Sequence, residues 1–157
     1  MILRKLELKD ATLMLEWMHD KTVVNNLKVN FMSKTIEDCE SFIINSWNDK
    51  ENLHLAIDVN GEYMGTVSLK NIEKNEAEFA ITIRKVAMGR GISKKAMAEI
   101  IRIGFEEKGL KKIYWYVDSA NQRAIKFYDK NGYQRIDNPE FIKIEDNARY
   151  IWYQVER

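Results

Sequence analysis

Alternating apolar and polar positions predict most of the strands in this chain. Residues 53–59 and 63–69 both alternate in this way, and Asn60-Gly61 stands between them. Asn and Gly tolerate the positive φ that both central residues of a type I′ turn require, so the segment predicts a β-hairpin. A polar turn is expected from Asn71 to Glu76. The same alternation predicts further strands at 3–8, 77–83, 113–117, 133–136 and 150–155.

Apolar positions recur at helical spacing in four other segments. Asp10 is expected to cap a helix that begins beside it, and Thr35–Asp38 has the spacing of a capping box that opens a second helix. A third helix is expected over 91–108 and a fourth over 119–131. Their expected stop signals are Gly109 and Gly132.

The elements therefore follow the order β-α-α-β-β-β-α-β-α-β-β. This order predicts one α/β domain over residues 1–157, with a mixed, mostly antiparallel sheet flanked by about four helices. Residues 137–147 show no pattern that predicts an element.

Composition restricts the class of protein. With 157 residues, of which 45% are hydrophobic, one core is expected. No apolar run approaches the roughly 20 residues of a membrane helix, and the N-terminus lacks the apolar region of a signal peptide, so we expect a cytosolic protein without a membrane partner. Cys39, the only cysteine, has no partner for a disulfide or a zinc site; it is expected to be packed, and no metal site is predicted.

The net charge of +1 hides an uneven distribution along the chain. Residues 84–135 contain 13 Lys and Arg against 5 Asp and Glu, whereas the remainder contains 12 against 19. A basic segment suits a polyanion, either a nucleic acid or a phosphorylated cofactor. A solvated helix face accounts for the same charges, so charge alone does not decide between them.

Two glycines mark the predicted turn between strand and helix as a candidate anion site. Backbone N–H groups at a helix N-terminus lack partners and share the positive end of the helix dipole. The spacing excludes a P-loop and the dinucleotide fingerprint, while a tight turn that needs glycine only for its conformation stays an alternative. The turn reads Met88, Gly89, Arg90, Gly91, Ile92 and Ser93.

Two further features are candidates for chemistry. Asn121 and Tyr128 are seven residues apart and share a face if both lie on a helix. A tyrosine that packs its ring and solvates its hydroxyl explains that spacing equally well. Glu78 lies in an apolar strand on the parity opposite Phe79; it is a candidate general base if its face lines a cleft, and an ordinary surface residue otherwise.

Together these features resemble the GNAT superfamily of N-acetyltransferases over nearly the whole chain. The turn resembles the family's Gln/Arg-x-x-Gly-x-Gly/Ala motif, although Met88 and Ser93 depart from it. Residues 121–128 match the family's Asn-x-x-Ala-x-x-x-Tyr helix, and Gly132-Tyr133 matches the strand start that follows. Ala77-Glu78 resembles the pair that opens the fourth strand in the ribosomal-protein and polyamine branches.

The resemblance implies an acetyl-CoA-dependent N-acetyltransferase that transfers the acetyl group directly within a ternary complex. The turn Met88–Ser93 would hold the pyrophosphate on its amides, and Asn121 would contact the pantetheine arm. Glu78, directly or through water, would deprotonate the amine, and Tyr128 would protonate the departing sulfur. Backbone amides where the family's strand bulges and splays would hold the pantetheine and polarise the acetyl carbonyl; they belong to Ile81, Thr82 and Ile83.

The acceptor is less sharply defined. A small amine or amino sugar is favoured because 15–20 resembles the amino-sugar branches, while the acidic remainder of the chain favours a cationic acceptor. Alternatives are a protein N-terminal or polyamine acetyltransferase, a non-catalytic acetyl-CoA sensor and, less favoured, a nucleic-acid binder. The expected partners are acetyl-CoA and an amine, without nucleic acid, and a homodimer stays open. Candidates for lining the acceptor pocket are Trp17, Asp20, Phe31, Trp47 and Tyr150.

Overall fold

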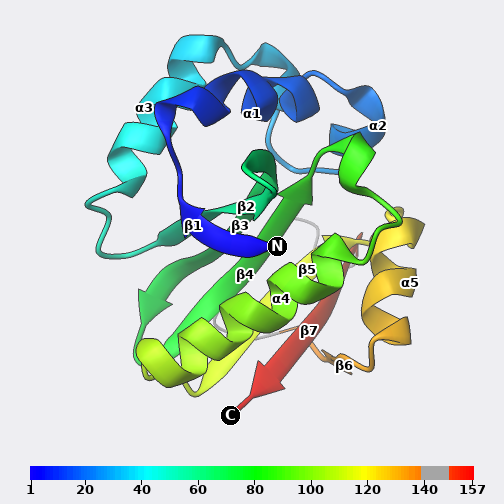
Figure 1. The fold of residues 1–157 in the computed structure, drawn as a ribbon. Helices are drawn as coiled ribbons and strands as arrows, with labels where there is room; N and C mark the ends of the chain where they lie inside the picture. Colours follow the sequence, from blue (N-terminus) through cyan, green and yellow to red (C-terminus); the bar gives the residue numbers. More distant parts are fainter. Residues whose placement is uncertain (139–148) are drawn as a thin grey trace.

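The computed structural model describes residues 1–138 and 149–157, and a seven-stranded sheet organises them (Figure 1). The strand order is β1-β2-β3-β4-β5-β7-β6, and only β4 and β5 run parallel. The predicted mixed, mostly antiparallel sheet is therefore confirmed. The strands are β1 Ile2–Lys5, β2 Leu53–Val59, β3 Glu62–Glu73, β4 Glu76–Ile83, β5 Lys112–Asp118, β6 Gln134–Ile136 and β7 Tyr150–Glu156.

Within residues 1–138 and 149–157, five α-helices flank the sheet. They are α1 Ala11–Met18, α2 Lys21–Val24, α3 Ile36–Ser46, α4 Ile92–Arg102 and α5 Gln122–Lys130. Short 3₁₀ turns lie at Leu8–Asp10, Phe31–Ser33 and Lys85–Ala87. The sequence pattern did not predict α2, because four residues are too few to show a helical period. None of the helices in the described ranges combines the length and the apolar character needed to cross a bilayer.

The helices cover the sheet in two groups, each with its own core. α4 lies along one face, where Phe79, Ile100 and Trp115 belong to a buried cluster to which α5 also contributes (Figure 1). α1, α2 and α3 gather together and bury a second cluster that includes Met14 and Cys39. Cys39 is fully buried, as expected of a packed thiol.

The turns follow the residues that tolerate positive φ. Asn60 and Gly61 have φ of 53° and 86°, so the predicted turn between β2 and β3 is confirmed. The next turn is shorter than the predicted 71–76: β3 continues to Glu73, and only Lys74 and Asn75 connect it to β4, with φ of 49° and 67°. A register shift between Lys70 and Glu73 accommodates the one extra residue on β3.

The two predicted helix caps have different outcomes. Thr35 accepts a hydrogen bond from the Asp38 amide at 3.2 Å and donates its own amide to the Asp38 carboxylate at 2.8 Å, which confirms the capping box. Asp10 makes no side-chain cap of α1. Its buried carboxylate instead accepts two hydrogen bonds from Arg4, at 2.8 and 2.9 Å. Leaving a buried charge unpaired costs more free energy than leaving a helix end uncapped.

The two later helices stop where predicted, although their bodies are shorter. α4 passes into a π-helical turn over Ile103–Glu107, and Gly109 ends the segment at a φ of 67°. α5 spans fewer residues than the predicted 119–131, and Gly132 follows it at a φ of 81°. Positive φ without a Cβ penalty explains both stops.

Gly65 on β3 allows a close approach to β4. A Cβ at this position would collide with the Thr82 carbonyl oxygen and lie 2.8 Å from the Ile83 Cα. We predict that Gly65→Ala lowers the free energy of unfolding by about 1–3 kcal/mol, because backbone atoms have little room to move. Gly104→Ala is the control, since its Cβ would meet only side-chain methyl groups, at 3.0 to 3.2 Å. Equal urea midpoints for the two variants would contradict this account.

Candidate active site

The parallel strands β4 and β5 part shortly after they meet. Their pairing covers three residues of each strand and ends at Glu78 and Tyr114. Beyond that point β4 stays paired with β3 up to Ile83, and β5 stays paired with β7. We call this opening the fork: it lies between Phe79–Ile83 of β4 and Trp115–Asp118 of β5, with Glu78 and Tyr114 at its apex.

The fork confirms the expected splay of β4, but the expected bulge is absent. Gly65–Lys70 and Glu78–Ile83 pair without a register shift. In this part of the sheet the irregularity lies one strand further away, between Ile57 and Asp58 of β2. The strands part because the β4–β5 pairing stops, and β4 itself continues in regular register.

Backbone direction determines which amides of β4 face the fork. The Arg84 amide donates to the Met64 carbonyl of β3 at 2.8 Å. Amide direction alternates along an antiparallel strand, so the Thr82 amide also faces β3. The amides of Ile81 and Ile83 consequently face the fork. Of the three residues expected to offer amides, two therefore do so.

The glycine turn lies at the start of α4. Gly89 and Gly91 have φ of 74° and 75°, and Gly91 is the N-cap. A Cβ on either glycine would meet no atom within 4 Å, so conformation, and not crowding by the protein, requires glycine here. A glycine N-cap also leaves the first amides of α4 without a side-chain acceptor. Ile92 is buried in the core, so only its backbone can serve this site.

Cations surround the glycine turn. Arg90, Lys94 and Lys95 are exposed and form no ion pair within the described residues. Arg123 of α5 reaches across and places its Nη1 3.1 Å from the sulfur of Met88. Met88 therefore joins the turn to α5, although its type departs from the family motif. The amides, the helix dipole and these charges together suit a phosphate group.

Arg84 connects the end of β4 to the first helical group. Its Nε and Nη2 donate to the two carboxylate oxygens of Glu16 on α1, at 2.8 and 3.1 Å. Its Nη1 donates to the Tyr63 carbonyl at 3.1 Å. The arginine is 7% exposed, and the Glu16 hydrogen bonds raise its pKa, so it remains charged. This planar, bidentate pair connects α1 to the end of β4.

Asn121 and Tyr128 occupy different environments. Asn121 lies just outside α5 as its N-cap, and its side-chain oxygen accepts a hydrogen bond from the Ala124 amide at 3.2 Å. The condition that both residues lie within one helix is therefore not met, because Asn121 caps the helix that carries Tyr128. Tyr128 is buried on the core side of α5.

The Tyr128 ring lies in an aromatic cluster. Its centroid is 5.3 Å from Trp115 and 5.1 Å from Tyr153, and Tyr133 packs against the same tryptophan. The Tyr128 hydroxyl has no hydrogen-bond partner among the residues that the structure describes. Burial, followed by the neighbouring Tyr153 and Tyr133, raises the pKa of Tyr128, so its hydroxyl keeps its proton at neutral pH.

Glu78 at the apex of the fork is paired with a cation. Its Oε2 lies 3.0 Å from Nζ of Lys70, which is directly opposite it on β3. Tyr114 and Tyr116 of β5 lie close enough that Glu78, after burial, raises the pKa of both hydroxyls. Glu78 is thus neither free nor an ordinary surface residue, because its side chain is mostly buried within an ion pair.

The residues expected to line the acceptor pocket each have their own contacts in the structure. Trp17 is buried and donates to the Tyr63 hydroxyl at 2.9 Å, with Phe31 packed on its edge at 5.0 Å. Asp20 caps α2 by accepting from the Thr22 amide. Trp47 donates to the Leu6 carbonyl, and Tyr150 packs against Tyr116.

Neither histidine forms a catalytic pair. His19 bonds the Lys34 carbonyl at 2.7 Å, and His54 bonds the Ser68 hydroxyl at 2.6 Å. Burial lowers the pKa of His54 and favours its neutral form. No group of three potential metal ligands occurs among residues 1–138 and 149–157.

Sequence reasoning missed Arg84 and Lys70. The only signal for Arg84 is its position, as a charged residue directly after an apolar strand. Lys70 follows Leu69 at the end of the alternating run, and nothing in the sequence indicates that it faces Glu78. Which residues face each other across two strands depends on the register of the strands. The two-residue turn between β3 and β4 sets this register, and the longer turn predicted from the sequence would have given a different one.

A mixed sheet that parts between its two parallel strands, beside a glycine turn at a helix N-terminus, is the architecture of the GNAT fold. Residues 1–134 match the family described as the acetyltransferase (GNAT) domain. The chain therefore belongs to this family.

Known relatives agree with this placement. Spermidine N(1)-acetyltransferase of Escherichia coli K12 is 32% identical over 87 residues, which are 54% of this chain and 47% of that protein. The match thus spans about half the length of the curated relative. Spermidine N-acetyltransferase of Vibrio cholerae, solved with CoA and spermine, superposes with a TM-score of 0.82 at 19% identity, over 99% of this chain and 94% of that one.

A solved structure that is not named as a spermidine acetyltransferase has the same fold. Mycobacterium smegmatis RimJ, solved with CoA-disulfide, gives a TM-score of 0.81 at 14% identity, over 98% of this chain and 80% of that one. At such low sequence identities the structural likeness establishes only the fold. The acceptor has to be inferred from the residues of the site.

Proposed function

We propose that this protein is an acetyl-CoA-dependent N-acetyltransferase whose acceptor is a cationic alkylamine such as spermidine. The observation that carries the proposal is the fork, where two amides of β4 point into an opening that begins at a carboxylate. The glycine turn and the buried tyrosine flank β4 and β5, so the chain offers groups for each part of the reaction.

The residues present fit acetyl-CoA. The Gly91 N-cap leaves the first amides of α4 free and puts no side chain in front of them. Arg90, Lys94 and Lys95 supply positive charge for phosphates. Ile81 and Ile83 supply amides at the spacing of alternate residues, which suits an extended chain lying along β4 as an added strand would. When bound, acetyl-CoA supplies the acetyl thioester.

Each chemical task then has a residue in the chain. Amides of the fork orient the thioester arm and donate to the carbonyl oxygen, where negative charge develops. Glu78 accepts the proton of the ammonium group, directly or through water, so that the amine nitrogen becomes a nucleophile. Tyr128 carries its proton at neutral pH, as tyrosine ordinarily does, and its raised pKa is consistent with this; it donates that proton to the departing sulfur. Asn121 holds the start of α5, which carries Tyr128.

The acceptor class is inferred from two observations. Glu78 already binds the primary ammonium of Lys70 at 3.0 Å, so this carboxylate accommodates an alkylammonium. Two of the relatives above are named as spermidine acetyltransferases, one of them solved with spermine. Both support the polyamine alternative over an amino sugar.

Coenzyme A release tests the function. We expect the purified protein to release thiol from acetyl-CoA in proportion to added spermidine, with one acetylated product per thiol. An acetyl-CoA sensor would bind acetyl-CoA in calorimetry and release no thiol with spermidine or any other primary amine. Binding without release across an amine panel would therefore refute catalysis.

Gly91 tests the phosphate site. We predict that Gly91→Val weakens acetyl-CoA binding at least about tenfold, since a β-branched residue disfavours the positive φ and blocks the amides. Gly109→Val is the matched control, because it has a φ of 67° and equal open space at the opposite end of the α4 segment. Calorimetry should find control and parent alike. If Gly91→Val and Gly109→Val both bound acetyl-CoA as tightly as the parent, the glycine turn would not be part of the binding site.

Tyr128 tests the proton donor. We predict that Tyr128→Phe keeps the fold and acetyl-CoA affinity but lowers kcat by roughly 10²- to 10⁴-fold, nearer the lower figure because coenzyme A is a good leaving group. Tyr133→Phe removes a hydroxyl from the same aromatic cluster and should change kcat by less than about twofold. Equal kcat for parent and Tyr128→Phe, with chemistry shown to be rate-limiting, would exclude this role.

A further inference from the structure

The ion pair between Lys70 and Glu78 lies at the point where an acceptor amine would have to bind. Glu78 is the last residue of β4 that pairs with β5, so its carboxylate stands at the apex of the fork. Lys70 faces it from β3 and places Nζ 3.0 Å from Oε2. The Glu78 side chain is 15% exposed and that of Lys70 is 37% exposed, so the lysine is the partner with more access to solvent.

Lys70 presents the chemical group that the proposed acceptor presents. Both are primary ammonium groups at the end of an unbranched alkyl stem, and both seek the same carboxylate. Two such cations cannot share one monodentate contact without mutual repulsion. An ion pair with more than a third of one partner exposed is weak, so an incoming ligand can open it.

We propose that Lys70 is an internal competitor for the acceptor's ammonium group and thereby sets the affinity of this protein for cationic amines. The inference rests on the proposed function. The acceptor binds Glu78 once the Lys70 side chain has turned toward solvent, and the residual charge of Lys70 opposes every acceptor that carries further ammonium groups. Lys70 is a specificity-determining residue and takes no part in proton transfer.

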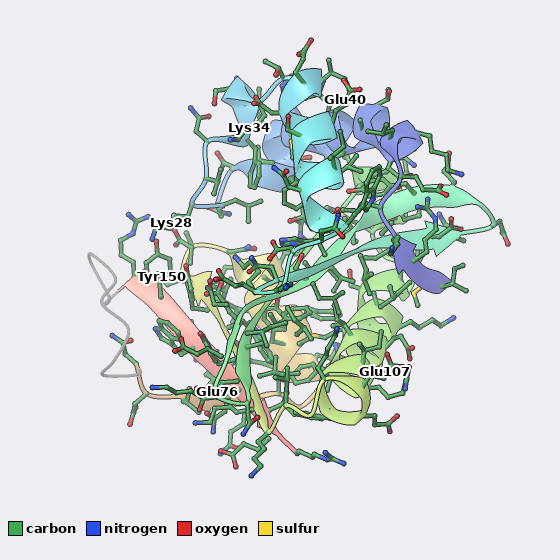
Figure 2. All side chains as sticks on the ribbon, turned by 90° about the vertical axis from the view of Figure 1, so that its left-hand side faces the viewer. Lys28, Lys34, Glu40, Glu76, Glu107 and Tyr150 are labelled. Atoms are coloured by element: carbon green, nitrogen blue, oxygen red, sulfur yellow. The ribbon has the colours of Figure 1, made fainter. Side chains whose placement is uncertain are left out.

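A second pair on the same face provides an internal comparison. Lys112 of β5 and Glu76 of β4 lie 3.4 Å apart, with side chains 34% and 35% exposed. Glu76 and Glu78 point to the same side of β4 because they are two residues apart. Glu76 lies at the end of the sheet away from the helical group that carries Lys34 and Glu40 (Figure 2). The Lys112 pair thus has the same chemistry but lies outside the fork.

The test is a binding measurement that needs no turnover. Spermidine is titrated by calorimetry into protein saturated with coenzyme A, after melting temperatures and coenzyme A affinities of all variants are shown to match. We expect Lys70→Met to bind spermidine about two- to fivefold more tightly than the parent, the range that release from a partly exposed ion pair allows. Lys70→Gln is a second neutral variant with the same expected gain.

Controls separate competition from a general change in charge. Lys112→Met removes one positive charge from the same face and should leave spermidine affinity within about 1.5-fold of the parent, since exposed charges beyond the contact are screened. Lys70→Arg keeps the charge and should resemble the parent. The double variant Lys70→Met with Glu78→Gln should not show the tighter spermidine binding of Lys70→Met, because it has no Glu78 carboxylate for spermidine to bind.

The outcomes distinguish this inference from the proposed function. Unchanged or weaker spermidine binding by both neutral Lys70 variants overturns it, as do equal gains in Lys70→Met and Lys112→Met. Failure of the parent to bind spermidine at all, with coenzyme A bound, overturns both this inference and the proposed acceptor class, but not the binding of acetyl-CoA. A parent that binds no acetyl-CoA overturns the proposed function itself.

Discussion

The site depends on the early end of the pairing between β4 and β5. Backbone N–H and C=O groups must be paired or hydrated, so two strands that part need a third element or solvent to satisfy them. Here each strand keeps its outer partner, β3 or β7, and leaves its inner edge open. Ile81 and Ile83 therefore offer amides at fixed positions, and Glu78 marks where the opening begins. An extended ligand can pair with such an edge without any rearrangement of the sheet.

Polar contacts hold the surroundings of this opening in place. Arg84 connects the end of β4 to Glu16 of α1 through two hydrogen bonds, and so links the first helical group to the strand that borders the fork. Met88 and Arg123 connect the glycine turn to α5. These contacts link elements that are far apart in sequence, and they explain how a loop at a helix N-terminus and a tyrosine on another helix are held around one opening.

The two faces of the sheet differ in burial and in charge near the fork. On the side of α4 and α5, aromatic packing buries Tyr128 and raises the pKa of its hydroxyl, which stays protonated at neutral pH. On the opposite side Glu78 remains mostly buried and paired with a cation. The uneven charge along the chain thus places exposed cations at the glycine turn, whereas the carboxylate of Glu78 lies at the apex of the fork.

The sequence by itself determined the order of elements, the glycine positions and the residue types of the site, because periodicity, turn propensity and helix-end preferences act over a few residues. It placed Gly91, Glu78 and Tyr128 in the correct elements. The tertiary structure alone decided their partners. Asn121 became an N-cap, one of three candidate amides turned away from the fork, and Lys70 came to face Glu78. The last two outcomes depend on strand register and on where the β4–β5 pairing ends. Both involve residues that are distant in the chain, so no local sequence pattern indicates them.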